Sequence, residues 1–216
     1  MPSYHLYYSP GACSLAPHIA LEELGIAYET TRVTIAEGLN TRPEYLAVNP
    51  RGRVPALAIS DVDGGKALTE AMAIMILLAR RFPQAQLLPE DTVQFARAVE
   101  WMGWLGSTLH QTGVRTVFRP ERFVSDPAVA DKVAEKGREM VRSGVADIDS
   151  RLEGKDWALG ERYSLVDAYL LVFFRWGNRI GLPMRSQFPE FTRVMDAVRA
   201  RPAVQRAVEQ EGIQIE

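Results

Sequence analysis

The chain has 216 residues and a mass of 24.1 kDa, which is long enough to bury a sizeable core. Hydrophobic residues make up 47% of the chain and charged residues 24%, a globular mixture that excludes disordered, collagen-like and coiled-coil proteins. The formal net charge is −2 and neither half of the chain is basic, which argues against a nucleic-acid partner.

Three features of the sequence bear on its cellular location. The single cysteine, Cys13, excludes an intrachain disulfide framework. The N-terminus lacks a basic segment followed by a long apolar one, so it does not resemble a signal peptide. The longest strongly apolar stretch, 168–174, is far too short to cross a bilayer. We therefore expect a cytoplasmic protein with no membrane partner.

The first 82 residues alternate between strand-like and helix-like patterns. A short aromatic run at 5–8 ends in Ser9-Pro10-Gly11, a strong turn signal. Apolar residues then recur at helical spacing from Leu15 until Gly25, which stops the helix. The predicted elements are, in order, a strand at 5–8, a helix at 15–24, strands at 28–35, 56–59 and 66–68, and a helix at 71–82. This order, βαβ followed by ββα, predicts a small α/β domain over residues 1–82.

The rest of the chain is predicted to be helical. Residues 83–90 form a short linker, and residues 91–216 form an all-helical domain. Ser164 can cap a helix in which Asp167 occupies the third position, ahead of an apolar run. A further helix is expected at 188–200, ended by Arg201-Pro202. Apolar residues at helical spacing define two longer helix faces: Phe95, Val99, Met102 and Leu109 on one, and Val141, Val145, Ile148 and Leu152 on the other.

Cys13 lies just after a predicted strand and turn, where a helix is predicted to begin. The first N–H groups of a helix are unpaired and its dipole end is positive, so a sulfur there is expected to be stabilised as a thiolate. The hydroxyls of Ser9 and Ser14 are nearby donors. The alternative is a buried free cysteine that acts as a small hydrophobic residue. Because no second cysteine stands at Ala16, any disulfide of Cys13 needs an external thiol, which suggests a small-molecule thiol partner.

Two further segments could bind a ligand through their backbone. A residue before proline is pushed into extended geometry, so Val54, ahead of Pro55, could pair with a peptide-like ligand if the peptide bond is cis. The alternative is a proline that starts an edge strand. Thr69 could cap a helix that opens at Glu70, where free N–H groups bind carboxylates and the glutamate accepts from an ammonium. The alternative is that these residues only cap the helix and bind no ligand.

Four segments together resemble one protein family. They are YSPGACSLAPHIAL at 8–21, LAVNPRGRVPAL at 46–57, LTE at 68–70 and LGERYSLVDAY at 159–169. With these motifs the chain closely resembles the cytosolic glutathione S-transferases, specifically the bacterial beta class, over essentially its whole length. The resemblance implies a thioredoxin-like N-terminal domain that binds glutathione as co-substrate, and an all-helical C-terminal domain that shapes the pocket for the electrophile.

The resemblance also implies the residues of the site. Cys13 faces the glutathione sulfur, Val54 ahead of a cis Pro55 pairs with the cysteinyl part of glutathione, and Glu70 with Ala71 holds its γ-glutamyl end. The predicted catalytic residues are Cys13, Ser14 and His110, and the predicted glutathione-binding residues are Tyr8, Cys13, Val54, Pro55, Glu70, Ala71, Ser107 and His110.

This chain departs from the family pattern at three places. Ala71 stands where the family often has serine or glycine, a loop lysine is missing from 36–40, and Gly103 replaces an asparagine. The alanine loses a side-chain hydroxyl contact but keeps its backbone N–H, and the other two departures affect polar contacts near the thiol. They imply weaker glutathione binding or a different substrate. Taken without the resemblance, His110 is a structural residue among Trp101, Trp104 and Leu109; with it, a base and a structural residue are equally good interpretations.

The predicted activity is conjugation of glutathione to a small hydrophobic electrophile, or thiol–disulfide exchange through a mixed disulfide of Cys13 with glutathione. The alternatives are a non-enzymatic binding or interaction module on the same fold, and a specialised glutathione lyase or dehalogenase. A homodimer is expected, with apolar contacts from Met72, Met75, Phe95 and Trp101. No His or Cys pair has ligand spacing and no glycine-rich phosphate loop occurs, so neither a metal nor a nucleotide is expected.

Overall fold

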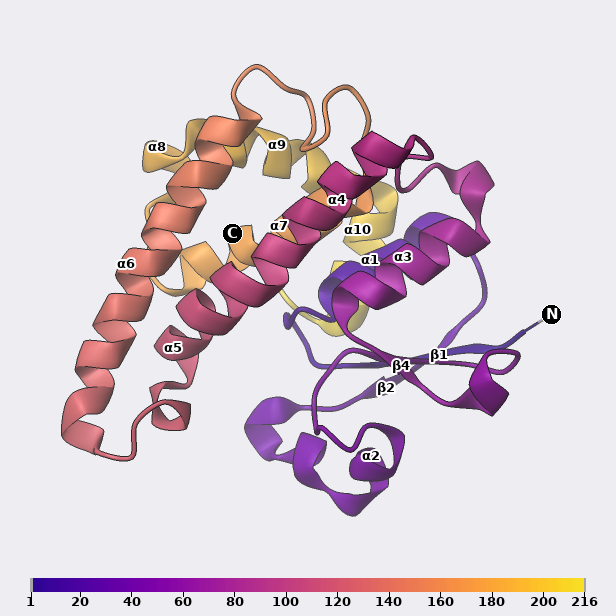
Figure 1. Cartoon of the computed structure of the whole chain (residues 1–216), viewed down its shortest axis with the longest axis horizontal. Coiled ribbons are helices and arrows are strands. Elements are labelled where there is room, and N and C mark those ends of the chain that lie inside the picture. The colour runs from indigo at the N-terminus through magenta and orange to yellow at the C-terminus, as the bar shows by residue number, and fades with distance from the viewer. Residues whose placement is uncertain (1, 216) are drawn as a thin grey trace. The chain divides into compact units, whose positions relative to one another are not determined.

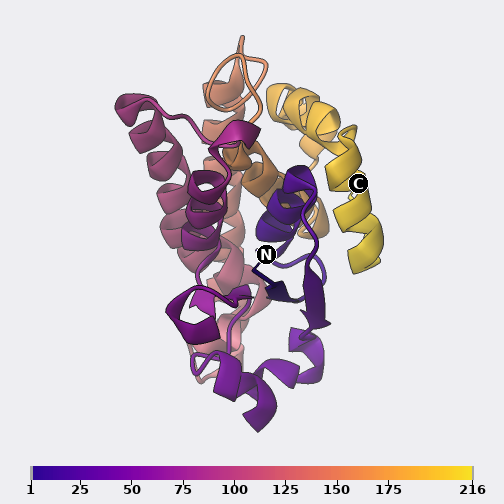
Figure 2. The same ribbon diagram turned by 90° about the vertical axis from the view of Figure 1, so that its right-hand side faces the viewer.

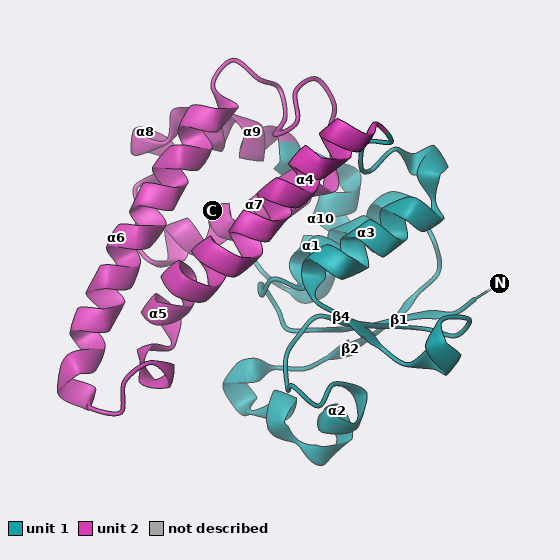
Figure 3. Cartoon of the chain, viewed as in Figure 1, with its two compact units in different colours: residues 1–90, 198–215 teal, residues 91–197, 216 magenta. Residues whose placement is uncertain are grey.

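The structure is a computed structural model that describes residues 2–215. Contacts divide these residues into two compact units, 2–90 with 198–215, and 91–197 (Figure 3). In this division residues 83–90, the predicted linker, belong to the first unit. The C-terminal segment also differs from the prediction, because residues 198–215 pack with the α/β unit instead of the helical one.

A four-stranded sheet forms the centre of the first unit (Figure 1). Its strand order is β2-β1-β3-β4, with β1 parallel to β2 and the other neighbours antiparallel. Leu6 of β1 pairs with Thr30 on one side and with Leu57 on the other. The strands are β1 (Tyr4–Tyr8), β2 (Glu29–Arg32), β3 (Ala56–Ile59) and β4 (Leu68–Thr69). The predicted βαβ-ββα order is therefore right, although β2 is shorter than the predicted strand at 28–35.

The helices of the first unit are α1 (Leu15–Leu24), α2 (Pro43–Val48), α3 (Ala71–Arg81) and α10 (Pro202–Glu211). Gly25 ends α1 in the left-handed conformation, at φ +62°, which glycine adopts without strain. Single 3-10 turns lie at Ile35–Glu37, Leu39–Thr41, Asp63–Gly65 and Pro83–Ala85. Helix α2 was not predicted, and its burial of Tyr45 places that ring under the loop that leads to β3.

The last helix, α10, lies beside α1 in both views of the ribbon (Figures 1 and 2). Its Ala203, Val204 and Ala207 are buried. Two arginines at its start and middle hold α1 by its acidic end: Arg201 donates to Glu23 and Arg206 to Glu22. The apolar spacing at 203, 204 and 207 predicts a helix, but only the tertiary contacts assign that helix to the first unit.

The second unit is helical throughout its core. Its helices are α4 (Thr92–Trp104), a π-helix (Leu105–Val114), α5 (Arg115–Phe118), α6 (Pro127–Leu152), α7 (Leu165–Arg179), α8 (Met184–Gln187) and α9 (Pro189–Arg199), with a 3-10 turn at Pro120–Arg122. A Cβ at Gly137 would lie 2.1 Å from the Thr116 hydroxyl, and one at Gly144 2.5 Å from a Leu109 methyl. These glycines let α6 approach the π-helix and α5 closely. No helix among the described residues is long and apolar enough to span a membrane.

Helix α7 begins at the predicted capping box. The Ser164 hydroxyl accepts from the Val166 N–H, and the Asp167 carboxylate accepts from the N–H groups of Ser164 and Ala158. Asp167 is completely buried, and this burial raises its pKa to about 6 against the lowering effect of those donors. The predicted α6 face of Val141, Val145, Ile148 and Leu152 is buried as expected. On α4, Phe95 and Val99 are only half-buried, because the burial there shifts to Ala98, Trp101 and Met102.

Candidate active site

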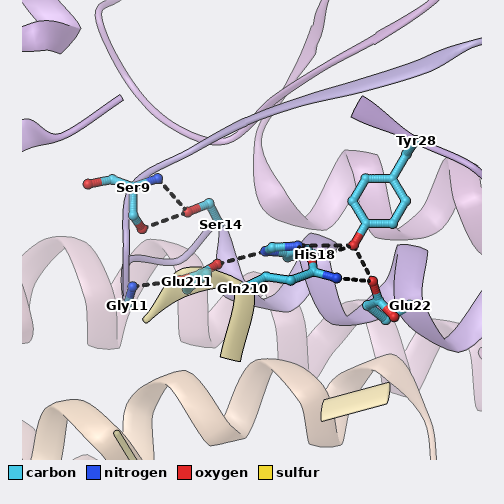
Figure 4. Close-up of polar contacts among 8 residues, drawn as sticks. All are labelled: Ser9, Gly11, Ser14, His18, Glu22, Tyr28, Gln210 and Glu211. Carbon is cyan, nitrogen blue, oxygen red and sulfur yellow. Dashed lines mark hydrogen bonds and ion pairs between the residues drawn. The ribbon is translucent and has the colours of Figure 1, made fainter. Parts of the chain in front are cut away.

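The turn between β1 and α1 is held by a reciprocal pair of hydrogen bonds (Figure 4). The Ser14 hydroxyl donates to the Ser9 carbonyl at 3.1 Å and accepts from the Ser9 N–H at 3.1 Å. Ser14 is completely buried. Its one hydroxyl hydrogen is therefore used inside the turn, and the geometry does not support the predicted catalytic role, in which Ser14 would donate to a ligand.

Cys13 and Val54 are brought together by this turn and by the loop before β3. The Cys13 thiol donates to the Val54 carbonyl oxygen, with 3.4 Å between sulfur and oxygen. Burial, and secondly the charge of Glu70, raise the pKa of Cys13 to about 12, against a lowering effect of its own backbone N–H and of Arg53. In the free protein Cys13 is thus a thiol, and the predicted thiolate is wrong for this state.

The helix start fails to stabilise a thiolate for a local reason. Cys13 lies one residue before the N-cap Ser14. The N–H groups of Leu15 and Ala16 already donate to the carbonyls of Ala12 and Cys13, and Pro17 has no N–H. Few unpaired donors of the first turn therefore remain for the sulfur.

The loop that carries Val54 is clamped from the segment around α2. The carbonyl of Arg53 accepts from the Tyr45 hydroxyl at 2.5 Å and from the Asn49 amide at 2.6 Å. The Asn40 amide donates to the Gly52 carbonyl at 2.9 Å. Gly52 has φ +58°, and a Cβ there would lie 2.8 Å from the Asn40 carbonyl oxygen, so only glycine fits. These three polar side chains hold the extended backbone that precedes Pro55.

The predicted cis peptide bond between Val54 and Pro55 is present. Among residues 2–215 the Val54 N–H has no acceptor, and the only partner of its carbonyl is the weak Cys13 thiol donor. The backbone of Val54, ahead of Pro55, thus offers an N–H donor without an acceptor and a carbonyl acceptor from which a ligand can displace the Cys13 thiol. A peptide-like ligand could add to this edge as a further strand.

Glu70 stands at the start of α3 in a strained conformation. Its φ is +71°, a region that costs a non-glycine residue free energy and is found most often at functional sites. Its exposed carboxylate has no partner among the residues that the structure describes, and neither do the N–H groups of Ala71 and Met72. The helix cap is Glu70 itself, not Thr69 as predicted, because Thr69 lies in β4 and accepts from Arg51 at 3.3 Å.

Tyr8 is placed on the α10 side of β1. Its ring packs 5.3 Å from the His18 ring. It also lines a cavity of about 510 Å³ beside the ends of α1 and α10, together with Tyr28 and Gln210. Burial, and then the charge of Glu211, raise the pKa of Tyr8. The structure therefore does not show Tyr8 beside the thiol.

Ser107 and His110 lie on the π-helix of the second unit. The Ser107 hydroxyl donates back to the carbonyl of Gly103 at 2.7 Å. The His110 ring is 4.7 Å from the Trp176 ring and 6.5 Å from Phe173. A π-helical turn is uncommon and occurs mostly at functional sites, yet nothing in the local sequence predicted it here.

No group of three or more His, Cys, Asp or Glu side chains is arranged to hold a metal ion within the described part of the chain. The ligands available at Cys13 and Val54 are a thiol and backbone groups, and at Glu70 a single carboxylate. These groups can hydrogen-bond an organic ligand with peptide character.

Sequence reasoning missed the residues that support the site from behind. Tyr45 and Asn49 were not singled out, although Asn49-Pro50 is a turn signal next to the loop they clamp. Glu211 was also missed: it is buried, and its carboxylate accepts from the Gly11 N–H at 2.7 Å (Figure 4). No pattern in the sequence links residues 200 positions apart.

The sheet order, the cis proline and the helical second unit define a thioredoxin-like domain followed by an all-helical domain. Models of the N-terminal and C-terminal domains of glutathione S-transferases match residues 11–81 and 107–202. The chain belongs to the glutathione S-transferase family. The predicted resemblance and fold class are therefore confirmed.

Individual relatives cover almost the entire chain. Glutathione S-transferase GstA of Escherichia coli O157:H7 is 33% identical over 96% of this chain and 98% of its own length. A glutathione transferase homologue from Sulfitobacter, solved with bound glutathione, is 32% identical with a TM-score of 0.90 over 99% of this chain and 100% of its own. The beta-class enzyme of Sphingomonas chungbukensis is 34% identical, with a TM-score of 0.83 over 97% and 100%.

Proposed function

We propose that this protein conjugates glutathione to a small hydrophobic electrophile, with glutathione bound in the first unit. The observation that carries the proposal is the open N–H of Val54 beside cis Pro55, next to the Cys13 thiol. The family membership and the glutathione-bound relative support the same ligand.

Each part of glutathione has a complementary group in this unit. Its cysteinyl backbone pairs with Val54, which displaces the Cys13 thiol from the Val54 carbonyl. The γ-glutamyl ammonium binds the Glu70 carboxylate, and the adjoining carboxylate binds the open N–H groups of Ala71 and Met72 at the start of α3. Arg53, whose guanidinium is exposed and has no partner among residues 2–215, supplies the positive charge that the missing loop lysine would provide.

The pKa of Cys13 favours conjugation over exchange. A thiol with a pKa of about 12 is a poor nucleophile at neutral pH but a competent hydrogen-bond donor. Once released from the Val54 carbonyl, it donates to the glutathione sulfur and stabilises that thiolate. The glutathione proton passes to solvent, the thiolate forms a carbon–sulfur bond with the electrophile, and the leaving group departs. Cys13 itself forms no covalent bond.

The second unit is proposed to shape the pocket for the electrophile. The family resemblance assigns Ser107 and His110 to the glutathione-binding residues, with His110 as a catalytic residue that assists by hydrogen bonding. The tilted packing of the His110 ring against Trp176, with 4.7 Å between the ring centroids, supports a fixed ring orientation. The proposed site of action is the cytoplasm.

A homodimer is also proposed, from the family resemblance. Of the four apolar residues expected at its interface, Met75 and Trp101 are buried within the chain, and Arg151 covers the Trp101 ring at 3.4 Å. Met72 and Phe95 are half-buried and remain candidates.

Calorimetric titration with glutathione, followed by turnover of an aromatic halide, tests the proposal. We expect one glutathione per chain and conjugate formation. Glu70→Gln should weaken binding roughly tenfold or more, as for loss of a hydrogen bond to a charged group. Glu44→Gln is the matched control, since Glu44 is also exposed and lies in the first turn of α2. Binding without turnover would favour the non-enzymatic alternative, and no binding would contradict both.

A further inference from the structure

The carboxylate of Glu211 links the last helix of the chain to the turn that carries Cys13. The Glu211 side chain is fully buried. One of its oxygens accepts from the Gly11 N–H at 2.7 Å, and the other lies 3.0 Å from His18 Nδ1 (Figure 4). Gly11 lies two residues before Cys13 and has φ +64°.

Polar side chains also surround the second ring nitrogen of His18. Its Nε2 lies 2.7 Å from Gln210 Oε1 and 3.1 Å from the Tyr28 hydroxyl oxygen. Gln210 cannot be turned round, because its Nε2 donates to Glu22 Oε1 at 2.8 Å, and the Tyr28 hydroxyl also donates to that carboxylate.

Both ring nitrogens of His18 are therefore engaged by polar groups of neighbouring side chains. The His18 and Glu211 side chains that meet here are fully buried. Removing one of them leaves the other buried with an unsatisfied polar group, which costs more than losing an exposed contact. The Glu211 carboxylate is thus fixed by His18 on one side and holds Gly11 on the other.

We propose that Glu211 is a positioning residue: held by the His18 ring, it anchors Gly11 and so fixes the turn that presents Cys13 to Val54 and to the ligand. The effect of Glu211 on glutathione binding rests on the proposed function. Its effect on the placement of Cys13 does not, because the Cys13 thiol contacts the Val54 carbonyl in the free protein.

The position of Glu211 makes a matched control available. Glu23 of α1 accepts two bonds from Arg201, so it belongs to the same contact between α1 and α10 without touching the turn. Glu23→Gln removes one negative charge from that contact, as Glu211→Gln does. Glu211→Asp keeps the charge but withdraws the carboxylate by one methylene.

The experiment measures three quantities for the full-length protein and each variant. They are the melting temperature, the rate at which a small disulfide reagent modifies Cys13, and the dissociation constant for glutathione. For both Glu211 variants we expect Cys13 modification to be about tenfold faster and glutathione binding about tenfold weaker, the effect of losing one charge-assisted hydrogen bond. Glu23→Gln should leave both within about twofold, as for a partly exposed ion pair.

The outcomes distinguish a positioning role of Glu211 from a role in packing alone and from an effect of its charge alone. A lower melting temperature with unchanged Cys13 modification and glutathione binding would overturn the proposal. So would an effect of Glu211→Gln that Glu211→Asp lacks, because charge alone would then act. Should neither variant fold, hydrogen exchange of the wild-type Gly11 amide decides: slow exchange supports the anchor, and exchange as fast as at exposed Gly64, whose N–H has no acceptor among residues 2–215, contradicts it. If wild-type protein fails to bind glutathione, the proposed function fails, while Cys13 modification and amide exchange still test Glu211.

Discussion

The packing of the Cys13 side chain determines how fast its thiol reacts. Comparing the reaction rates of the native and the unfolded chain measures this effect. Burial, followed by the charge of Glu70, raises the pKa of Cys13 from 9.0 to about 12. A rise of about three units lowers the thiolate fraction at pH 7 about a thousandfold. The thiolate that does form is more nucleophilic, by roughly twentyfold for a Brønsted coefficient of about 0.45. Native Cys13 should therefore react roughly fiftyfold more slowly than unfolded Cys13.

The assay follows reaction with a small disulfide reagent at pH 7, with and without urea, by intact mass. A single site is modified because the chain has one cysteine. The native rate should climb about tenfold per pH unit well beyond pH 9, where the unfolded rate levels off. Since the folded pKa lies above the unfolded one, this thiol contributes stability that is present below about pH 9 and is lost as pH rises toward 12.

A native rate equal to or above the unfolded rate would refute this reasoning. It would mean that the helix start does stabilise a thiolate, and that exchange through Cys13 is chemically open. Glutathione itself, with the same reagent, provides the reference rate for a solvated thiol.

Four further predictions concern the thiol, the second unit and the assembly. Cys13→Ser should abolish any mixed disulfide with glutathione but retain part of the conjugation rate, because a serine hydroxyl can still donate to the glutathione thiolate; equal loss of both activities, measured on one preparation, would contradict this. Asp167→Ala should lower the unfolding free energy by about 2 kcal/mol in a urea titration, since it leaves buried N–H donors of the capping box unpaired. Burial raises the pKa of Asp167 to about 6, above about 3.9 in an unfolded chain. Protonation of Asp167 therefore contributes stability that is fully present below about pH 4 and is lost as the pH rises through 6. Asp167→Asn should remove this pH dependence of the unfolding free energy. Sedimentation at micromolar concentration should give twice the chain mass, whereas 24.1 kDa would contradict the homodimer.

The elements that sequence predicted well are set by local chemistry. Gly25 stops α1, Ser164 and Asp167 start α7, and the strand order follows from the succession of short runs and turns. Each of these depends on residues within a few positions of one another, so one sequence is enough to find them.

Several predictions about the site were wrong because other groups of the folded chain compete for the same hydrogen bonds. The thiolate prediction for Cys13 counted the donors of the helix start, but nearby carbonyls already occupy them. Ser14 was expected to face a ligand, but its hydroxyl is used by Ser9. The cap of α3 moved from Thr69 to Glu70 because Thr69 is needed in β4.

Long-range contacts were beyond any local pattern. The helix at 202–211 belongs to the first unit because Arg201 and Arg206 bind the acidic end of α1. Glu211 then reaches Gly11, and Tyr45 reaches the carbonyl before Val54. A pairing of this kind depends on the path of the whole chain.

The central claim is that glutathione pairs with the open backbone of Val54, and the exchange rate of the Val54 amide hydrogen measures this most directly. In the free protein that N–H has no acceptor among residues 2–215. At saturating glutathione its exchange should slow by at least about tenfold, as for an amide that gains a hydrogen bond. The Gly64 amide, in the exposed turn before β4, should not change. If Val54 exchanges at the same rate with and without bound glutathione, the ligand does not pair there and the proposed site is wrong.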